Sequence, residues 1–107
     1  MPSFLLKDAR FVLLTYSQTP ANFDYWSIVD TFAGLKAECL VAKEQHQDGG
    51  DHYHVFVDFG RKFSTRVDTA FDVTGCHPNI AKCGKTPWLA FDYCCKDGNI
   101  LAGVVIS

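Results

Sequence analysis

The stretch His52-Tyr53-His54-Val55-Phe56-Val57 decides how this chain folds. It is rich in aromatic and branched residues, which favour a strand, and the side chains of a strand alternate between its two faces. Every second residue, as far as Phe59, forms an apolar stripe that predicts a side facing a core. His52 and His54 project together from the other side.

Two imidazoles one pleat apart form a ready pair of metal ligands. The polar segment 45–51 comes just before them and predicts a turn that folds Glu44 back beside the two histidines. A carboxylate with two imidazoles suits Mg²⁺ or Mn²⁺, and zinc would also bind such a set. The sequence therefore predicts a divalent-metal site formed by Glu44, His52 and His54.

The rest of the chain predicts further strands and two helices around this strand. We expect strands at 10–16, 39–44, 52–59 and 77–81, a short strand or ordered loop at 63–73, and a last strand or packed tail at 100–106. One helix follows a turn at 17–22, with Asn22 or Asp24 as its N-cap, and the other spans 87–96. This order predicts an α+β fold in one domain, 1–107: an antiparallel sheet of about five strands with helices packed on it.

Composition excludes several classes of protein. The chain has 107 residues, 48% hydrophobic and 14% aromatic, which fits one small globular domain. No segment approaches the roughly 20 apolar residues of a membrane span, and residues 1–4 do not begin a signal peptide, so we expect an intracellular protein without a membrane partner. The five cysteines include no CxxC pair, which argues against a zinc knuckle and favours buried, reduced thiols.

Charge is distributed unevenly. The net charge of −2 argues against a general polyanion binder. The segment 60–85 differs, because its cationic residues outnumber its carboxylates. A small phosphate-binding surface and an ordinary solvated loop explain this surplus equally well. The cationic residues are Arg61, Lys62, Arg66, Lys82 and Lys85.

The second predicted helix has two distinct sides. Trp88, Phe91 and Cys95 form an apolar stripe that we expect to face the core. Tyr93 and Lys96 lie three residues apart on another side, where the ammonium stabilises the phenolate that a tyrosine nucleophile requires. The pair is a weak signal alone, but beside a metal site it suits phosphodiester transfer, with Tyr93 attacking phosphorus.

These motifs together resemble the HUH endonuclease domain of replication initiator (Rep) proteins of small circular single-stranded DNA viruses. Residues 13–16 (Leu-Leu-Thr-Tyr) resemble the first motif of that family, 52–57 the second and 93–96 (Tyr-Cys-Cys-Lys) the third. The segment 61–80, ending His77-Pro78-Asn79-Ile80, resembles an extra segment of geminivirus-like Reps. Pro2-Ser3-Phe4 and Asp48-Gly49-Gly50 point more narrowly to genomovirus Reps. The resemblance covers almost the whole chain.

The resemblance implies an RRM-like sheet and a metal-dependent, sequence-specific endonuclease and strand transferase for single-stranded DNA. It implies that Glu44, His52 and His54 hold the metal, that Tyr93 is the nucleophile and that Lys96 assists it. The enzyme would nick the stem-loop of a viral origin through a 5′-phosphotyrosine and start rolling-circle replication in the host nucleus. The expected DNA contacts are Arg61, Lys62, Arg66, His77, Asn79, Lys82 and Lys85, with Arg10 and Lys43 as additions.

Two departures from the family pattern are visible. Ser17 stands where the first motif commonly has proline, which affects origin recognition rather than chemistry. Full Rep proteins continue into a helicase and are expected to oligomerise, whereas no GxxxxGK[ST] loop occurs here. We therefore expect this chain to be the N-terminal part of a longer Rep or a short form.

Two other classes of function stay open. A non-catalytic module that binds single-stranded nucleic acid would stack bases on aromatic residues of the sheet. No such exposed aromatic pair is evident on the central strands, and this function gives no reason for the histidine pair. A structural zinc domain is opposed by the lack of cysteine pairs.

Overall fold

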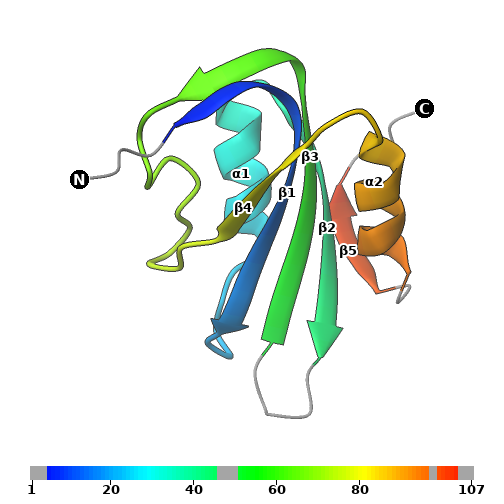
Figure 1. The fold of residues 1–107 in the computed structure, drawn as a ribbon. Helices are drawn as coiled ribbons and strands as arrows, with labels where there is room; N and C mark the ends of the chain where they lie inside the picture. Colours follow the sequence, from blue (N-terminus) through cyan, green and yellow to red (C-terminus); the bar gives the residue numbers. More distant parts are fainter. Residues whose placement is uncertain (1–4, 46–50, 97–98, 104–107) are drawn as a thin grey trace.

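The computed structural model describes residues 5–45, 51–96 and 99–103 (Figure 1). The predicted turn at 45–51 lies mostly outside these residues, as does the end of the 100–106 segment. The elements in chain order are β1 (Leu6–Thr19), α1 (Trp26–Gly34), β2 (Glu38–Gln45), β3 (Asp51–Thr65), β4 (Asn79–Cys83), α2 (Pro87–Cys95) and β5 (Ile100–Gly103). β1 continues through Thr19, so the turn predicted at 17–22 begins later than expected.

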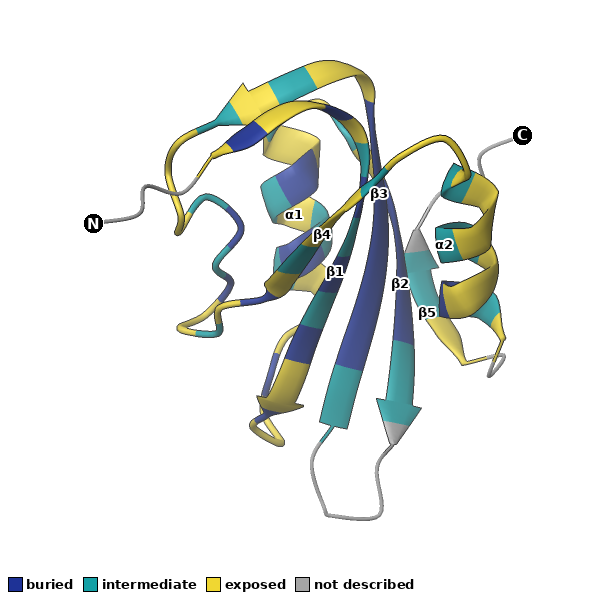
Figure 2. Ribbon diagram, in the orientation of Figure 1, coloured by how far each residue is buried: buried dark blue, intermediate teal, exposed yellow. Residues whose placement is uncertain are grey.

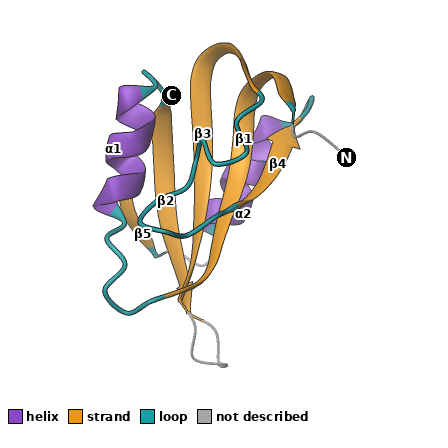
Figure 3. Ribbon diagram, turned by 90° about the vertical axis from the view of Figure 1, so that its left-hand side faces the viewer, coloured by secondary structure: helices purple, strands orange, loops and turns teal. Residues whose placement is uncertain are grey.

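One five-stranded sheet organises the domain. Its strand order is β4-β1-β3-β2-β5, and every pairing is antiparallel. β3 carries the histidine pair and lies at the centre, between β1 and β2. Figure 3 shows α1 and α2 on opposite faces of this sheet. The predicted α+β class is therefore confirmed.

The main core lies between the sheet and α1. The apolar stripe of β3 faces this side, and its Val55 and Val57 are fully buried. Ile28 and Phe32 of α1 are also fully buried against it. The N-cap of α1 is Tyr25, so the expectation of Asn22 or Asp24 is wrong, although Oδ1 of Asp24 accepts a hydrogen bond from the backbone N–H of Trp26. Figure 2 shows the middle of β3 buried, and the buried residues there are Tyr53–Phe59.

A smaller core lies between the other face and α2. Cys94 is the buried residue of α2, with Phe91 and Cys95 half-buried beside it. Trp88 is 59% exposed, so the expectation that it faces the core is wrong. The helix contacts the sheet through 90–91 and 94–95, which turns the indole of Trp88 outward.

All five cysteines are free thiols, and burial raises the pKa of Cys94 to about 12.

A twisted ribbon extends β1 and β3 beyond the sheet. The register of this pair shifts between the Ala9–Phe63 and Phe11–Asp58 pairings, and Gly60 has a φ of +72° there, which glycine adopts without strain. The predicted 63–73 element is thus partly the end of β3 and partly a loop. Phe71 of that loop is buried, whereas Val67 is 57% exposed.

Tyr16 anchors the loop to the sheet. Its hydroxyl donates a 2.6 Å hydrogen bond to the backbone carbonyl of Phe71, and both residues are fully buried. Tyr16→Phe leaves that carbonyl unsatisfied and should lower the free energy of unfolding by about 1–3 kcal/mol, measured by urea denaturation. Tyr25→Phe, at a half-buried tyrosine, is the matched control and should change it by less than about 0.5 kcal/mol. Equal losses in both variants would contradict the anchoring role.

Candidate functional site

The face of the sheet that carries α2 also carries the predicted site residues. Residues that pair directly across antiparallel strands project from the same face. Glu44 pairs with His52 in this way, and Thr15 pairs with His54 on the other side of β3. Asn79 of β4 pairs in turn with Thr15. A polar row therefore crosses three strands of this face, with the carboxylate of Glu44 one pleat away.

His54 is the best-defined member of the site. Only 6% of it is exposed, and its ring lies between β1 and β2 neighbours. Nδ1 lies 3.4 Å from the hydroxyl oxygen of Thr15, and Nε2 lies 3.5 Å from Oε2 of Glu44. Burial lowers the pKa of His54, and this outweighs the opposing effect of the Glu44 carboxylate. The imidazole is thus neutral at neutral pH, which is the form that binds a metal.

The predicted ligands share one face, and two of them are in contact. The buried Nε2 of His54 makes no hydrogen bond within the described residues, although it faces the Glu44 carboxylate. No three His, Cys, Asp or Glu side chains in the described part of the chain gather closely enough to hold a metal ion. The common face, the buried Nε2 and the oxygen and nitrogen donors suit a divalent cation by their chemistry, and metal binding stays a prediction.

Tyr93 of α2 contacts His54 of β3. Its ring meets the ring of His54 edge to face, with centroids 4.9 Å apart. The ammonium nitrogen of Lys96 lies 4.4 Å from the centre of the Tyr93 ring. The two residues that the Tyr-x-x-Lys spacing singled out are therefore neighbours, and they meet the histidine strand.

The four tyrosines of the chain differ in their exposure to solvent. Of the four tyrosines, all within the described residues, only Tyr93 is exposed, at 41%. Burial raises the pKa of Tyr16 and of Tyr53, which disfavours their phenolate forms. Among these side chains Tyr93 alone combines access to solvent with a neighbouring cation.

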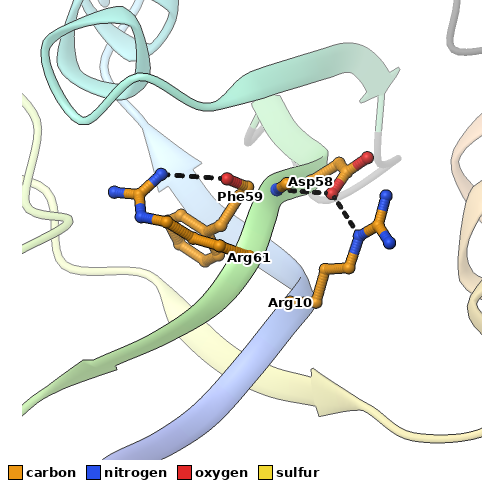
Figure 4. A network of polar contacts seen from close by, with 5 residues as sticks. Arg10, Asp58, Phe59 and Arg61 are labelled. Atoms are coloured by element: carbon orange, nitrogen blue, oxygen red, sulfur yellow. Dashed lines mark hydrogen bonds and ion pairs between the residues drawn. The ribbon is translucent and has the colours of Figure 1, made fainter.

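Two of the predicted DNA contacts lie on different faces of the sheet. The guanidinium of Arg61 donates to the carbonyls of Phe59 and Leu35, which ties it to the α1 side of β3 (Figure 4). Asn79 instead lies on the face of His54. A phosphate-binding surface over 60–85 therefore stays a prediction, with Arg61 and Asn79 on different faces of the sheet.

The remaining predicted contacts differ in their surroundings. The Nζ of Lys82 donates to the carbonyl of Lys7, and Nδ1 of His77 lies 2.6 Å from Oδ1 of Asp72. The cations of Lys62, Arg66 and Lys85 are exposed. Their contact with DNA stays a prediction.

Thr15 is a site residue to which the sequence analysis assigned no role. It positions His54, because a hydrogen bond at Nδ1 orients the ring and leaves Nε2 for a metal. The signal was present: residues 13–16 match a family motif, and alternation along that strand separates Thr15 from the buried Leu14 and Tyr16. The neighbouring residues in the sequence do not determine which strand pairs with β1 at Thr15, so its position beside His54 could not be predicted.

Comparison with known proteins gives one family. Residues 6–104 match the profile of the geminivirus Rep catalytic domain. The replication-associated protein A of Bean yellow dwarf virus is 34% identical over 97 residues, covering 86% of this chain and 32% of the relative. Its counterpart from Tobacco yellow dwarf virus (strain Australia) is 31% identical over 104 residues, covering 92% and 34%. The chain thus spans about a third of the length of these relatives.

Proposed function

Because this chain belongs to the geminivirus Rep catalytic domain family, we propose that it is a metal-dependent endonuclease that nicks single-stranded DNA through a covalent tyrosine ester. The observation that carries the proposal is the meeting of Tyr93 with His54 and Lys96 on one face of the sheet. An exposed phenol, a cation and a metal-ligand set on one face are the parts that phosphoryl transfer to tyrosine requires.

Tyr93 is the nucleophile in this proposal. Its phenol oxygen forms a bond to phosphorus and loses its proton, while the bond from phosphorus to the 3′ oxygen breaks and that oxygen gains a proton. The product is a 5′-phosphotyrosine and a free 3′-hydroxyl that a polymerase extends. The new ester is close in energy to the phosphodiester it replaces, so the same site reseals a strand. Lys96 places a positive charge 4.4 Å from the centre of the Tyr93 ring, where it offsets negative charge that develops during the transfer.

Glu44, His52 and His54 would hold the Mg²⁺ or Mn²⁺ ion. The ion supplies positive charge that polarises a phosphate oxygen. Thr15 orients His54 from behind, and the burial of that ring keeps it neutral and ready to bind. In this proposal β2 and β3 carry the metal ligands, β1 carries the residue that orients His54, and α2 carries the nucleophile.

The biological setting follows from the family. We propose that the nick falls in the stem-loop of a viral origin and starts rolling-circle replication in the host nucleus. We further propose that the domain acts as part of a longer protein that oligomerises.

A single experiment tests the reaction. The protein is incubated with a radiolabelled single-stranded oligonucleotide carrying the virus's own origin loop and with Mn²⁺, and a DNA-linked band is sought after denaturing electrophoresis. The proposal expects a band that needs the metal and disappears on protease treatment. Binding of the oligonucleotide without any adduct would favour the non-catalytic binding module instead.

The exposed cations should act through phosphates. Replacing Lys62 and Arg66 with glutamine should weaken binding of single-stranded DNA and reduce the slope of log K against log salt by about 1.4, because each lost phosphate contact removes roughly 0.7. The single variants Lys62→Gln and Arg66→Gln are each compared with Lys36→Gln, which removes one cation just after α1 and so matches the change in net charge. Fluorescence anisotropy between 50 and 200 mM salt gives both slopes. A slope equal to that of the control would show that Lys62 and Arg66 do not contact phosphates.

A further inference from the structure

An apolar groove opens between α2 and the sheet, on the face that carries His54 and Tyr93. Its volume is about 240 Å³. This is smaller than a typical drug-sized site and suits one flat ring system. The residues that line it are Phe11, Phe56, Pro87, Trp88 and Phe91.

Aromatic rings form the floor and the walls of this groove. Phe11 of β1 and Phe56 of β3 stack with centroids 5.8 Å apart and planes at 25°. Phe91 of α2 meets Phe56 edge to face at 5.6 Å. The central strands therefore carry an aromatic pair, but α2 covers Phe56, which is only 4% exposed, and Phe11 is half-buried. Trp88 completes the groove, and its indole is largely exposed rather than packed in the core.

A positive charge is held beside the aromatic floor. The guanidinium carbon of Arg10 lies 4.9 Å from the centre of the Phe11 ring. Its Nε donates to Oδ1 of Asp58 at 3.2 Å, and that buried carboxylate also accepts from the backbone N–H of Gly60 (Figure 4). More than half of the Arg10 side chain stays exposed. The groove thus combines stacking surfaces with an oriented cation, whose charge complements a phosphate.

We propose that this groove binds one unpaired base of the DNA strand, stacked on Trp88 and Phe11, while Arg10 contacts a phosphate next to that base. The inference rests on the proposed function, since it assigns a base-binding subsite to the same active face. Trp88 precedes Tyr93 by five residues, about 7.5 Å along the helix, so the base lies one or two nucleotides from the bond that is cut. Any of the four bases can stack on an aromatic ring. The subsite should therefore increase the affinity for single-stranded DNA and help to position the strand, without selecting a particular base.

Intrinsic fluorescence reports on the groove without any cleavage. The chain has two tryptophans, and Trp26 begins α1 on the far face of the sheet. In a Trp26→Phe protein Trp88 is the sole indole, and titration with oligo(dT) of 20 nucleotides should quench its emission. In a Trp88→Phe protein the emission of Trp26 should stay unchanged. Inorganic polyphosphate should quench neither, because it has charge but no bases.

Affinity gives the second measurement, with a closely matched control. Trp88 and Leu89 are adjacent in α2 and equally exposed, at 59% each, but only Trp88 lines the groove. Trp88→Ala should raise the Kd for oligo(dT) about 5- to 150-fold, the range for loss of one base–aromatic stack. Leu89→Ala should change it less than twofold. Both are measured in a Tyr93→Phe background, which prevents covalent capture.

The outcomes separate this inference from the proposed function. If the adduct at Tyr93 forms but Trp88 is not quenched and Trp88→Ala binds like Leu89→Ala, the subsite is wrong and the nicking proposal stands. If quenching occurs but no adduct ever forms, the groove binds bases in a protein that does not nick. If Trp88 emission shifts with protein concentration in the absence of DNA, the groove is an interface between copies of the chain, which overturns the subsite.

Discussion

Tyr93→Phe is expected to abolish nicking and the covalent adduct while leaving the fold and the affinity for DNA nearly intact. The change removes only the attacking oxygen. Because the residue is exposed, no buried hydrogen bond is lost with it. The ring contacts with His54 and Lys96 are retained, so the site keeps its shape. Loss of a nucleophile should reduce the cleavage rate by roughly 10³-fold or more.

Peptide mapping identifies the attachment site directly. The adduct is digested with trypsin and nuclease, and the nucleotide-bearing peptide is sequenced by mass spectrometry. We expect the modification at Tyr93 with its phosphate from the 5′ side of the cut. Tyr25→Phe serves as the control and should cleave at the parent rate. Modification at Tyr16, Tyr25 or Tyr53, or a free 5′-phosphate without an adduct, would show the mechanism to be wrong.

Removal of the metal ligands is expected to have the second largest effect. A cation that binds only the folded protein stabilises it, by about 2.7 kcal/mol at a concentration 100-fold above its Kd. For a domain of this size, that corresponds to a rise in Tm of roughly 10–20 °C with Mn²⁺. His54→Ala and His52→Ala should each erase this rise, together with cleavage. Each variant is compared with its own metal-free Tm, because burial of His54 alone makes its replacement costly.

His77 provides the matched control for that experiment. It is an exposed histidine in the loop before β4, where its Nδ1 lies 2.6 Å from Oδ1 of Asp72, and it is not one of the predicted metal ligands. His77→Ala should therefore keep the full rise in Tm with Mn²⁺. An unchanged rise in both site variants, or its loss in His77→Ala, would exclude Glu44, His52 and His54 as the metal ligands.

Alternation along single strands was predictable from sequence. The apolar and histidine sides of β3 require only that successive side chains point to opposite faces, which depends on a few neighbouring residues. The bounds of α2 followed for the same reason, since Pro87 suits the first position of a helix. Glu44 and His52 then pair directly because the hairpin between β2 and β3 closes over a short segment.

Placement of α2 against the sheet was not predictable in this way. The apolar spacing along the helix predicted that Trp88 faces the core, but contact through Cys94 and Phe91 leaves it on the rim of the groove. A helix of nine residues has apolar side chains on more than one side, so its spacing does not select the buried one. Packing against the sheet determines which side of α2 is buried.

The positions of the charged side chains relative to the sheet were the least predictable feature. Arg61 and Arg10 are both arginines beside β3, yet Figure 4 shows them on opposite sides of that strand, one bound to carbonyls and one to Asp58. The bulge at Gly60 and the pairing of β1 with β3 decide their sides. Sequence by itself thus determined the strand that bears the ligands and the helix that bears the nucleophile, because both depend on local periodicity. Only the tertiary structure decided that they meet, because strand order and helix packing depend on burial across the whole chain.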